Sequence, residues 1–455
     1  MSANEKVDRY LVEGNLPLGI CKFALPFMLA YLLQALYGAI DLYVVGKFCD
    51  PAAVSAVGIG AQMLHLLLAA VFGLSMGGTV LIGFNVGAKD DEGAANAIGS
   101  TSTLFALLAL IATPIVALST DYCVGLMQTP QEAVDYTRQY VFICACGLPF
   151  IVGYNVVGAI YRGLGDSVTP TIFVVVACLA NIVGDFLLIG YFKLGPAGAA
   201  YATVASQALS FFYALVHMRK TWFHFEFHRT NFILRRKSVR AIFKVGVPLA
   251  LQDVLTCLSF LIIFAIVNMM GLYESAGLAV AERVIGFLLL PPIAFSSAVT
   301  TATSQNCGAK KYRRAFKAFL FGASFSLVFG VSFWLLCQIC PNAIASIFTH
   351  DPAVAEQGAK YLRSFTIDCI LVAFIFNING YFCGCGKAIV VSAHSVFAAV
   401  CARIPISYFF SKLPNATLYH VGFAAPLASL TSIVVCVGYF VWLRATGKLS
   451  LKDEA

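Results

Sequence analysis

Long apolar runs separated by short polar breaks are the dominant pattern of this chain. A bilayer core about 30 Å thick needs about 20 apolar residues in a helix that rises about 1.5 Å per residue. Runs of that length predict twelve transmembrane helices, with the approximate limits 18–41, 53–80, 95–118, 134–158, 168–191, 197–218, 241–265, 276–303, 315–338, 356–381, 388–410 and 420–443. Because twelve is even, both ends of the chain are expected on one side of the membrane.

Composition supports a membrane protein and argues against a water-soluble one. Of the 455 residues, 60% are hydrophobic and 11% are charged, whereas soluble domains carry about 25% charged residues. The 15 cysteines are an odd number without the spacing of a disulfide framework. We therefore expect an all-α membrane protein whose cysteines are small apolar side chains.

Basic residues are concentrated in the loops of one side. The loops after odd-numbered spans contain only Lys47, Lys193 and Lys412, while both termini and the other loops are rich in Lys and Arg. The positive-inside rule then predicts cytoplasmic termini. The net charge of +8 follows from this topology and does not indicate nucleic-acid binding. The long basic loop 219–240 is interpreted as a cytoplasmic linker, with contact to anionic lipids as the alternative.

The two halves of the chain repeat the same landmarks at a nearly constant offset. Pro26 corresponds to Pro248 at an offset of 222, and the Gly-Ala-Lys at 87–89 corresponds to that at 308–310 at an offset of 221. Such repetition indicates duplication of a structural unit. Because each half has six spans, the halves should face the same way and be related by a pseudo-two-fold axis along the membrane normal.

The fold expected from this repeat is two six-helix bundles joined by a linker. The predicted limits are 1–218 for the N-terminal lobe, 219–240 for the basic linker and 241–455 for the C-terminal lobe.

Several stretches resemble the multidrug and toxic compound extrusion (MATE) family. The segment ALPFMLAYLLQALYGAIDLYVVG at 24–46, with an early Pro and an acidic residue before its last Gly, is similar to the first span of that family. The loops GAKDDEGA at 87–94 and GAKKYRRA at 308–315, and the turn RGLGD at 162–166, are similar to further MATE landmarks. The resemblance covers nearly the whole chain and is greatest to the bacterial DinF-like and NorM-like branches.

This resemblance implies an antiporter of the bacterial inner membrane. Such a protein exports cationic or amphipathic drugs in exchange for H⁺ or Na⁺ by alternating access. We expect it to be a monomer that needs no cofactor beyond the coupling ion and is not an enzyme. Its expected partners are a small organic substrate and membrane lipids.

The N-terminal half carries a candidate cation-coupling site. Asp41 in the first span and Asp185 in the fifth fall at similar depth, Asn181 lies one helical turn from Asp185, and Thr203 reaches a similar level. A charged side chain inside the membrane costs about 2.5–3.5 kcal/mol, so it needs a partner or a function. Two such carboxylates would favour binding of a proton or of Na⁺. The alternative is an interfacial Asp41 with Asn181 and Asp185 capping neighbouring helices; DinF-like members carry matching groups, and the resemblance favours coupling.

The C-terminal half offers a possible second polar site at Asp253, Glu282, Asp368 and Arg403. In NorM-like members, acids in spans 7 and 10 bind a cation, and Asp253 and Asp368 could do so here. Counted back from Gly384, however, Asp368 is about one turn from the expected position, and Asp253 is also displaced. A structural pairing of these acids with Arg403 is the alternative, and Glu282 is expected to face a cavity or an interface.

His65 could shuttle protons within the second span, although a lone histidine in a membrane helix is more often hydrogen-bonded between helices. Pro26 and Pro248 interrupt their spans and are candidate hinges.

Two rival functions remain to be weighed. A flippase or exporter of lipid-linked saccharides would need a strongly basic cavity, but Arg403 is the clearest embedded cation. A membrane-embedded enzyme would need a convergent catalytic set, which the sequence does not show.

Overall fold

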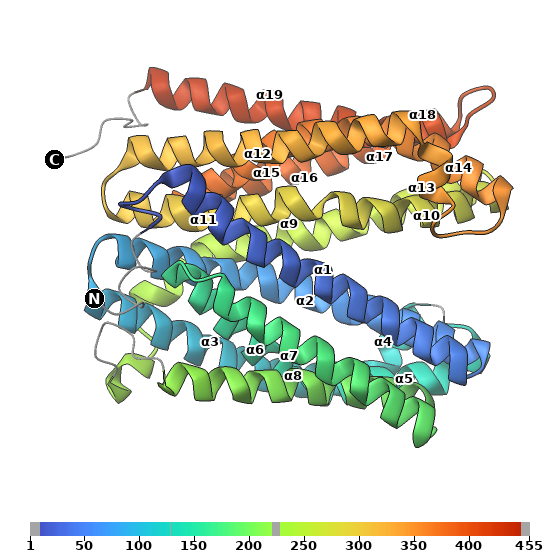
Figure 1. The fold of residues 1–455 in the computed structure, drawn as a ribbon, viewed down its shortest axis with the longest axis horizontal. Coiled ribbons are helices and arrows are strands. Elements are labelled where there is room, and N and C mark those ends of the chain that lie inside the picture. The colour runs from blue at the N-terminus through green and yellow to red at the C-terminus, as the bar shows by residue number, and fades with distance from the viewer. Residues whose placement is uncertain (1–9, 128, 221–227, 447–455) are drawn as a thin grey trace. The chain divides into compact units, whose positions relative to one another are not determined.

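The computed structural model describes residues 10–127, 129–220 and 228–446, and these residues form helices joined by turns, with no strand among them (Figure 1). Contacts divide the chain into two lobes. The N-lobe comprises residues 29–246, and the C-lobe comprises residues 1–28 together with 247–455. The sequence predicted lobes of 1–218 and 241–455, whereas packing places residues 10–28 with the second half of the chain and residues 228–246 with the first.

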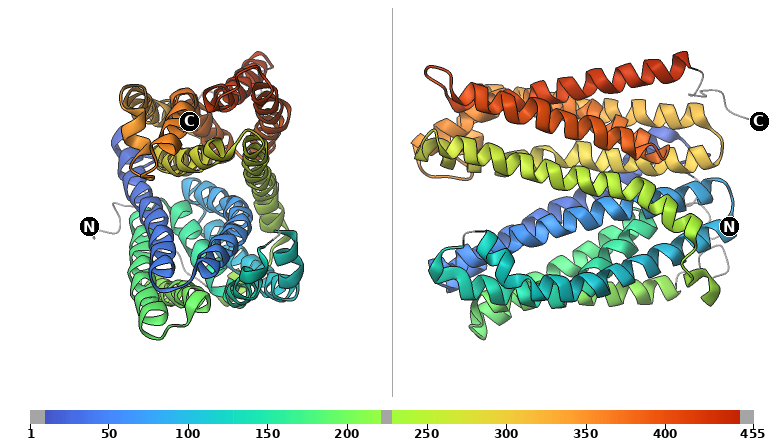
Figure 2. Two further views of the ribbon diagram at one scale, coloured as in Figure 1. Left: turned by 90° about the vertical axis from the view of Figure 1, so that its right-hand side faces the viewer. Right: turned by 180° about the vertical axis from the view of Figure 1, so that it is seen from behind.

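The N-lobe takes in the second part of the first helix and the seven helices that follow it (Figure 2). These helices are α1 Leu16–Phe48, α2 Pro51–Gly87, α3 Asp91–Leu118, α4 Thr120–Leu126, α5 Val134–Cys146, α6 Leu148–Leu164, α7 Val168–Asp185 and α8 Gly195–Lys220. Shorter segments are the 3-10 turns η2 Gln131–Ala133 and η4 Arg229–Phe232 and the π-helix η3 Phe186–Tyr191. Within this lobe α7 packs along α8, and α2 packs along α3, α5 and α6.

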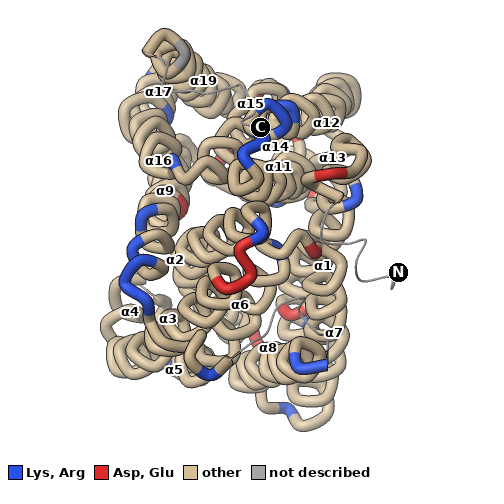
Figure 3. The backbone as a smooth tube through the Cα atoms, turned by 90° about the vertical axis from the view of Figure 1, so that its left-hand side faces the viewer, with Lys and Arg blue, Asp and Glu red and all other residues tan. Residues whose placement is uncertain are grey.

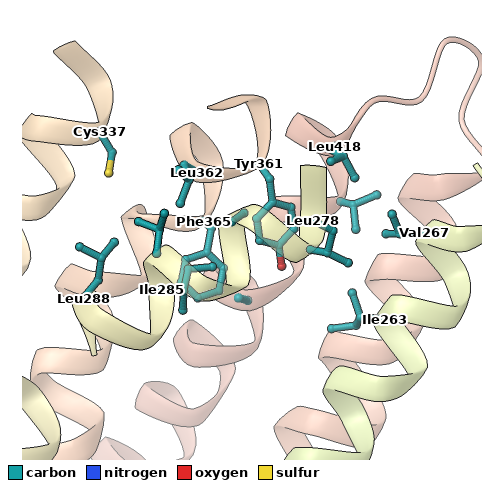
Figure 4. Packing of buried hydrophobic residues seen from close by; sticks show 14 of the residues in the cluster. Ile263, Val267, Leu278, Ile285, Leu288, Cys337, Tyr361, Leu362, Phe365 and Leu418 are labelled. Carbon is teal, nitrogen blue, oxygen red and sulfur yellow. The ribbon is translucent and has the colours of Figure 1, made fainter. Parts of the chain in front are cut away.

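The C-lobe contains the greater part of α9 and the helices after it. They are α9 Arg236–Asn268, α10 Leu272–Leu288, α11 Leu290–Gly308, α12 Tyr312–Ile339, α13 Pro341–Ala345, α14 Pro352–Phe365, α15 Ile367–Gly384, α16 Ala388–Phe397, the π-helix η5 Ala398–Arg403, α17 Ile404–Ser411, α18 Leu418–Gly422 and α19 Ala424–Ala445. Leu278, Ile285, Tyr361, Phe365 and Leu418 form part of its buried apolar core (Figure 4).

The structure confirms the predicted number of spans. Among the described residues, 11 helices are long and apolar enough to cross a membrane, or up to 12 when one bent pair is counted as a span. That pair is Gln131–Cys146 with Leu148–Leu164, bent by 53°. The break falls just before Pro149, where a missing N–H and a steric clash with the preceding residue interrupt a helix.

Backbone conformation repeats between the two halves. Lys89 and Lys310 both have positive φ, 57° and 59°, and so do Gly165 and Gly386, at 94° and 71°. Residues with a side chain seldom adopt this left-handed conformation, so its recurrence at an offset of 221 shows that the Gly-Ala-Lys landmark is a shared helix-ending turn. The internal duplication predicted from the sequence is therefore visible in the local structure.

Candidate functional site

Three helices of the N-lobe bring the predicted coupling residues together. Asp41 lies on α1, Asn181 and Asp185 on α7, and Thr203 on α8, and all four side chains are buried. Asp41 interacts with both Asp185 and Asn181. Tyr140 on α5 interacts with Thr203 and with Asp41, and so links the hydroxyl to the acidic pair.

Several polar atoms of this cluster are buried and lack a hydrogen bond of ordinary geometry. Both carboxylate oxygens of Asp185, both polar atoms of the Asn181 amide, Asp41 Oδ1 and Thr203 Oγ1 make no such bond with a described residue, although these side chains lie near enough to interact with one another and with Tyr140. Unsatisfied buried polar groups are rare in folded proteins, and each needs an explanation such as an ion or a catalytic role. Two carboxylates, an amide oxygen and a hydroxyl match the ligands of a hard cation, and either carboxylate can take up a proton.

Close helix packing sets this arrangement. A Cβ added at Gly184 would lie 3.0 Å from Ala202 Cβ, so α7 and α8 approach closely beside Asp185 and Thr203. Immediately after Asp185 the chain enters the π-helix η3. Short π-helical segments are frequent at functional sites because they change the direction of side chains along a helix.

An apolar cluster formed by α1, α2, α5, η3 and α8 includes Tyr140 of this site. Val44, Val57, Tyr140, Ile189 and Ala200 are among its buried members. In such surroundings the unpaired charged form of a carboxylate is unfavourable. The cluster therefore favours a bound proton or a bound metal cation over a bare charge.

Tyr37 and Tyr140 belong to this site but were not identified from the sequence. Tyr37 lies one helical turn before Asp41 on α1 and interacts with it. The ring of Tyr140 occupies the space that a Cβ at Gly60 of α2 would fill. A glycine facing an aromatic ring was the available signal, but it can be read only once α2 and α5 are known to pack together.

The predicted C-lobe residues separate into two places. Arg403 stacks over the ring of Phe260, 4.9 Å from its centroid, and its Nη1 donates to Ser259 Oγ at 3.4 Å. Glu282 and the buried Asp368 both interact with Arg403. Asp253 instead lies beside Cys257 and Cys383.

Each member of the C-lobe charge cluster keeps an unsatisfied buried atom. Glu282 Oε1, Asp368 Oδ1 and Arg403 Nε have no hydrogen-bond partner among the described residues. One guanidinium faces two carboxylates, so the cluster carries one net negative charge when all three groups are ionised. This differs from the N-lobe site, where two carboxylates have no neighbouring cation among the groups that interact with them.

The remaining predicted residues lie elsewhere. His65 is exposed on α2 and makes no hydrogen bond with another described residue. Pro26 and Pro248 lie inside α1 and α9, each within two residues of the point where the chain passes from one lobe to the other. These positions suit a bend but do not by themselves define one.

Two helical lobes with repeated landmarks and buried carboxylates are typical of polytopic membrane transporters. The MatE family matches the chain twice, over residues 26–187 and 248–409. The chain therefore belongs to the MATE family, whose members are transporters and not enzymes. The two matches begin at Pro26 and Pro248, the same pair that marked the duplication in the sequence.

Relatives and solved structures agree with this assignment. The chain is 26% identical over 436 residues to the probable multidrug resistance protein YoeA of Bacillus subtilis (strain 168), a match that covers 93% of each chain. Its fold is similar to a MATE structure in complex with MaL6, with a TM-score of 0.90, 22% identity and coverage of 96% of this chain and 99% of the other. It is also similar to a multidrug resistance MATE transporter in an outward-facing conformation, with a TM-score of 0.89, 23% identity and coverage of 98% of both chains.

Proposed function

We propose that this protein exports cationic or amphipathic organic compounds, and that H⁺ or Na⁺ binding at Asp41 and Asp185 drives the transport. The unsatisfied, buried polar atoms of the N-lobe site carry this proposal. Family membership and the multidrug-resistance relative support export of drugs. The protein acts in a bacterial inner membrane as a monomer with cytoplasmic termini.

The coupling step follows from the cost of buried charge. When both carboxylates are ionised without a counter-ion, desolvation and like-charge repulsion raise the free energy of the N-lobe site. Uptake of a proton or Na⁺ removes this penalty and changes the relative free energies of the two openings of the transporter. A ligand shifts such an equilibrium only by its difference in affinity for the two states, so the site must bind the ion more tightly in the state that releases the drug outside.

Bends in two helices would transmit the change. The chain passes between lobes within α1 and within α9, close to Pro26 and Pro248. Because proline removes a helical hydrogen bond, these are the points of α1 and α9 where bending costs least. Asp41 is on α1 itself, so ion binding at the site acts directly on one of the two crossing helices.

Transport in proteoliposomes tests the coupling proposal. Drug movement is measured with an imposed pH gradient and, separately, with an imposed Na⁺ gradient, for the wild type, Asp41→Asn and Asp185→Asn. We expect one of the two gradients to drive transport and each substitution to reduce gradient-driven transport at least tenfold. Asp135→Asn, which removes an 85% exposed carboxylate from the same lobe, is the matched control and should retain full transport.

Two results would contradict the proposal in different ways. Gradient-driven transport that survives in both Asn variants would exclude the acidic pair as the coupling site. Absence of drug transport in the wild type under either gradient, for protein that is folded and inserted, would exclude drug export itself. The drug resistance of cells that overexpress each variant provides an independent comparison of transport by the wild type and the variants.

A further inference from the structure

Residues 228–233, which precede α9, are held against α3. Asn231 is buried, and its Nδ2 donates to Asn96 Oδ1 of α3 at 2.7 Å, while its Oδ1 accepts from the His228 backbone N–H at 2.6 Å. Thr103 Oγ1 donates to the carbonyl of Phe232 at 2.7 Å. The backbone from 228 to 233 is therefore a fixed part of the N-lobe surface.

A glycine on α3 allows this close docking. A Cβ at Gly99 would overlap the carbonyl oxygen of Asn231. The hydroxyl of Ser100, the next residue on α3, donates to the carbonyl of Ile233 at 3.4 Å. Three successive carbonyl groups of the segment thus face α3, which turns the side chains that follow Asn231 away from the lobe.

The side chains turned outward are large and apolar. Phe232, Ile233 and Leu234 are 45%, 62% and 38% exposed. Three consecutive exposed apolar residues on a fixed backbone are costly in water. In a membrane protein, such residues at the end of a span are suited to insertion at the boundary between headgroups and acyl chains.

A group of cations follows directly. Arg235, Arg236, Lys237, Arg240 and Lys244 are all exposed and lie at and after the start of α9, where Lys and Arg follow one another along the backbone (Figure 3). None of the five makes an ion pair with another residue in the part of the chain that the structure describes. The first turn of α9 contains no acidic residue.

This charge distribution is unfavourable without a counter-ion. Arg236, Arg240 and Lys244 follow the i, i+4, i+8 spacing of one helix face, and like charges at that spacing repel each other. Cations near a helix N-terminus are also disfavoured by the helix dipole. Both effects are relieved when anionic groups lie beside the helix.

The length of α9 places these cations at the membrane surface. Its 33 residues extend about 50 Å at 1.5 Å per residue, whereas the bilayer core is about 30 Å thick. Several turns must therefore lie outside the hydrocarbon, and the exposed cations occupy the first nine residues of the helix. Long basic side chains at such a position extend toward the headgroups.

We propose that residues 232–244 form a binding surface for anionic phospholipid headgroups, in which Phe232, Ile233 and Leu234 enter the membrane boundary and the cations of early α9 contact lipid phosphates. The ligand chemistry is that of an acidic glycerophospholipid such as phosphatidylglycerol. The surface recognises both parts of the lipid, since the apolar residues contact the acyl chains while the cations contact the anionic headgroup.

Site-directed fluorescence tests this proposal on the full chain. Trp222, Trp334 and Trp442 are replaced by Phe, Ile233→Trp introduces a single reporter, and the protein is reconstituted in phosphatidylcholine vesicles that contain brominated phosphatidylglycerol or, separately, brominated phosphatidylcholine. We expect quenching by the anionic lipid to exceed quenching by the zwitterionic lipid at least twofold at equal mole fraction. High salt should reduce this ratio, because screening weakens contacts between exposed charges.

Charge removal with a matched control completes the experiment. In the same reporter background, Arg236→Gln, Lys237→Gln and Arg240→Gln together should bring the quenching ratio to about one, while quenching itself persists. Arg219→Gln with Lys220→Gln removes exposed cations from the end of α8 and should leave the ratio unchanged.

Three outcomes would overturn the proposal. Equal quenching by both lipids with all cations present would show a non-specific apolar contact, and no quenching by either lipid would place the segment away from the membrane. An equal loss of preference in the α8 control would assign the effect to overall positive charge. Retained helical content and a monodisperse elution profile show that each variant is folded.

Discussion

At the scale of single residues, the two lobes accommodate buried acids in different ways. The N-lobe places Asp41 and Asp185 together with polar groups but without a neighbouring cation among the groups that interact with them, and several polar atoms there make no hydrogen bond with a described residue. The C-lobe places Arg403 near Glu282 and Asp368, which compensates part of their charge internally. The first arrangement is suited to ion uptake and release, and the second to holding helices together.

Removal of Arg403 should therefore destabilise the C-lobe through the acids that it leaves behind. Loss of one partner of a buried charge pair costs about 3–5 kcal/mol, and the half-buried position of Arg403 places the expected loss nearer 1–3 kcal/mol. Arg403→Gln should lower the apparent Tm in detergent, and adding Glu282→Gln should restore part of the loss. Arg138→Gln, at an exposed ion pair, should change the Tm little. Additive losses in the double variant would contradict a direct interaction between Arg403 and Glu282.

The estimated depth of each residue along its predicted span was enough to select Asp41 and Asp185, which the structure brings together, but not their aromatic neighbours. A carboxylate in an apolar span is conspicuous because of its cost, whereas Tyr37 and Tyr140 resemble the many aromatic residues that face lipid or pack between helices. The pairing of Glu282 with Arg403 was also beyond the sequence, since these residues lie on α10 and at the end of η5. Only the packing of those segments decides which acid the guanidinium meets.

At the scale of helices, glycines fix how closely neighbouring elements approach. A Cβ at Gly77 of α2 would overlap the carbonyl oxygen of Ile242 in the first turns of α9. Gly77→Ala should force these helices apart and destabilise the N-lobe by about 1–3 kcal/mol, the usual cost of overpacking. Gly58→Ala in the same helix is the matched control, because its Cβ would meet nothing within 4 Å. It should leave the apparent Tm unchanged or raise it, since alanine is the better helix former.

Hydropathy predicted the spans but not their interruptions. The predicted fourth span is a bent pair, and the predicted tenth span, 356–381, is divided between α14, which ends at Phe365, and α15, which begins at Ile367. Apolar counting is insensitive to hydrogen-bond register, so the π-helices η3 and η5 also left no signal in it. The π-helix η3 begins directly after Asp185, and η5 ends at Arg403. Irregular backbone therefore lies beside the buried charges of each lobe.

At the scale of the whole molecule, the boundaries of the sequence repeat differ from those of the packed lobes. The duplication predicted boundaries between residues 218 and 241, but packing divides the chain after Met28 and after Gly246. Within the C-lobe, the backbone at residues 11 and 12 is held by side chains at the end of α11 and in the turn that follows it. Asn306 Nδ2 donates to the Leu11 carbonyl at 3.0 Å, and Lys311 Nζ donates to the Val12 carbonyl at 3.3 Å. Segments before the first helix of a repeat have no apolar run, so their docking could not be predicted from hydropathy.

The charge moved in one transport cycle gives the last prediction. If one proton enters for each monovalent organic cation that leaves, no net charge crosses the membrane. A membrane potential, which supplies about 2.3 kcal/mol per charge per 100 mV, then contributes nothing. In proteoliposomes with proton coupling, export of such a cation should respond to a pH gradient and not to a potassium diffusion potential, whereas export of a neutral substrate should respond to both. A response of the cation to both the pH gradient and the potential would indicate that more than one proton enters per cycle, as expected if Asp41 and Asp185 each exchange one, whereas a response to the potential alone would contradict proton coupling. Asp41→Asn vesicles report the leak that must be subtracted.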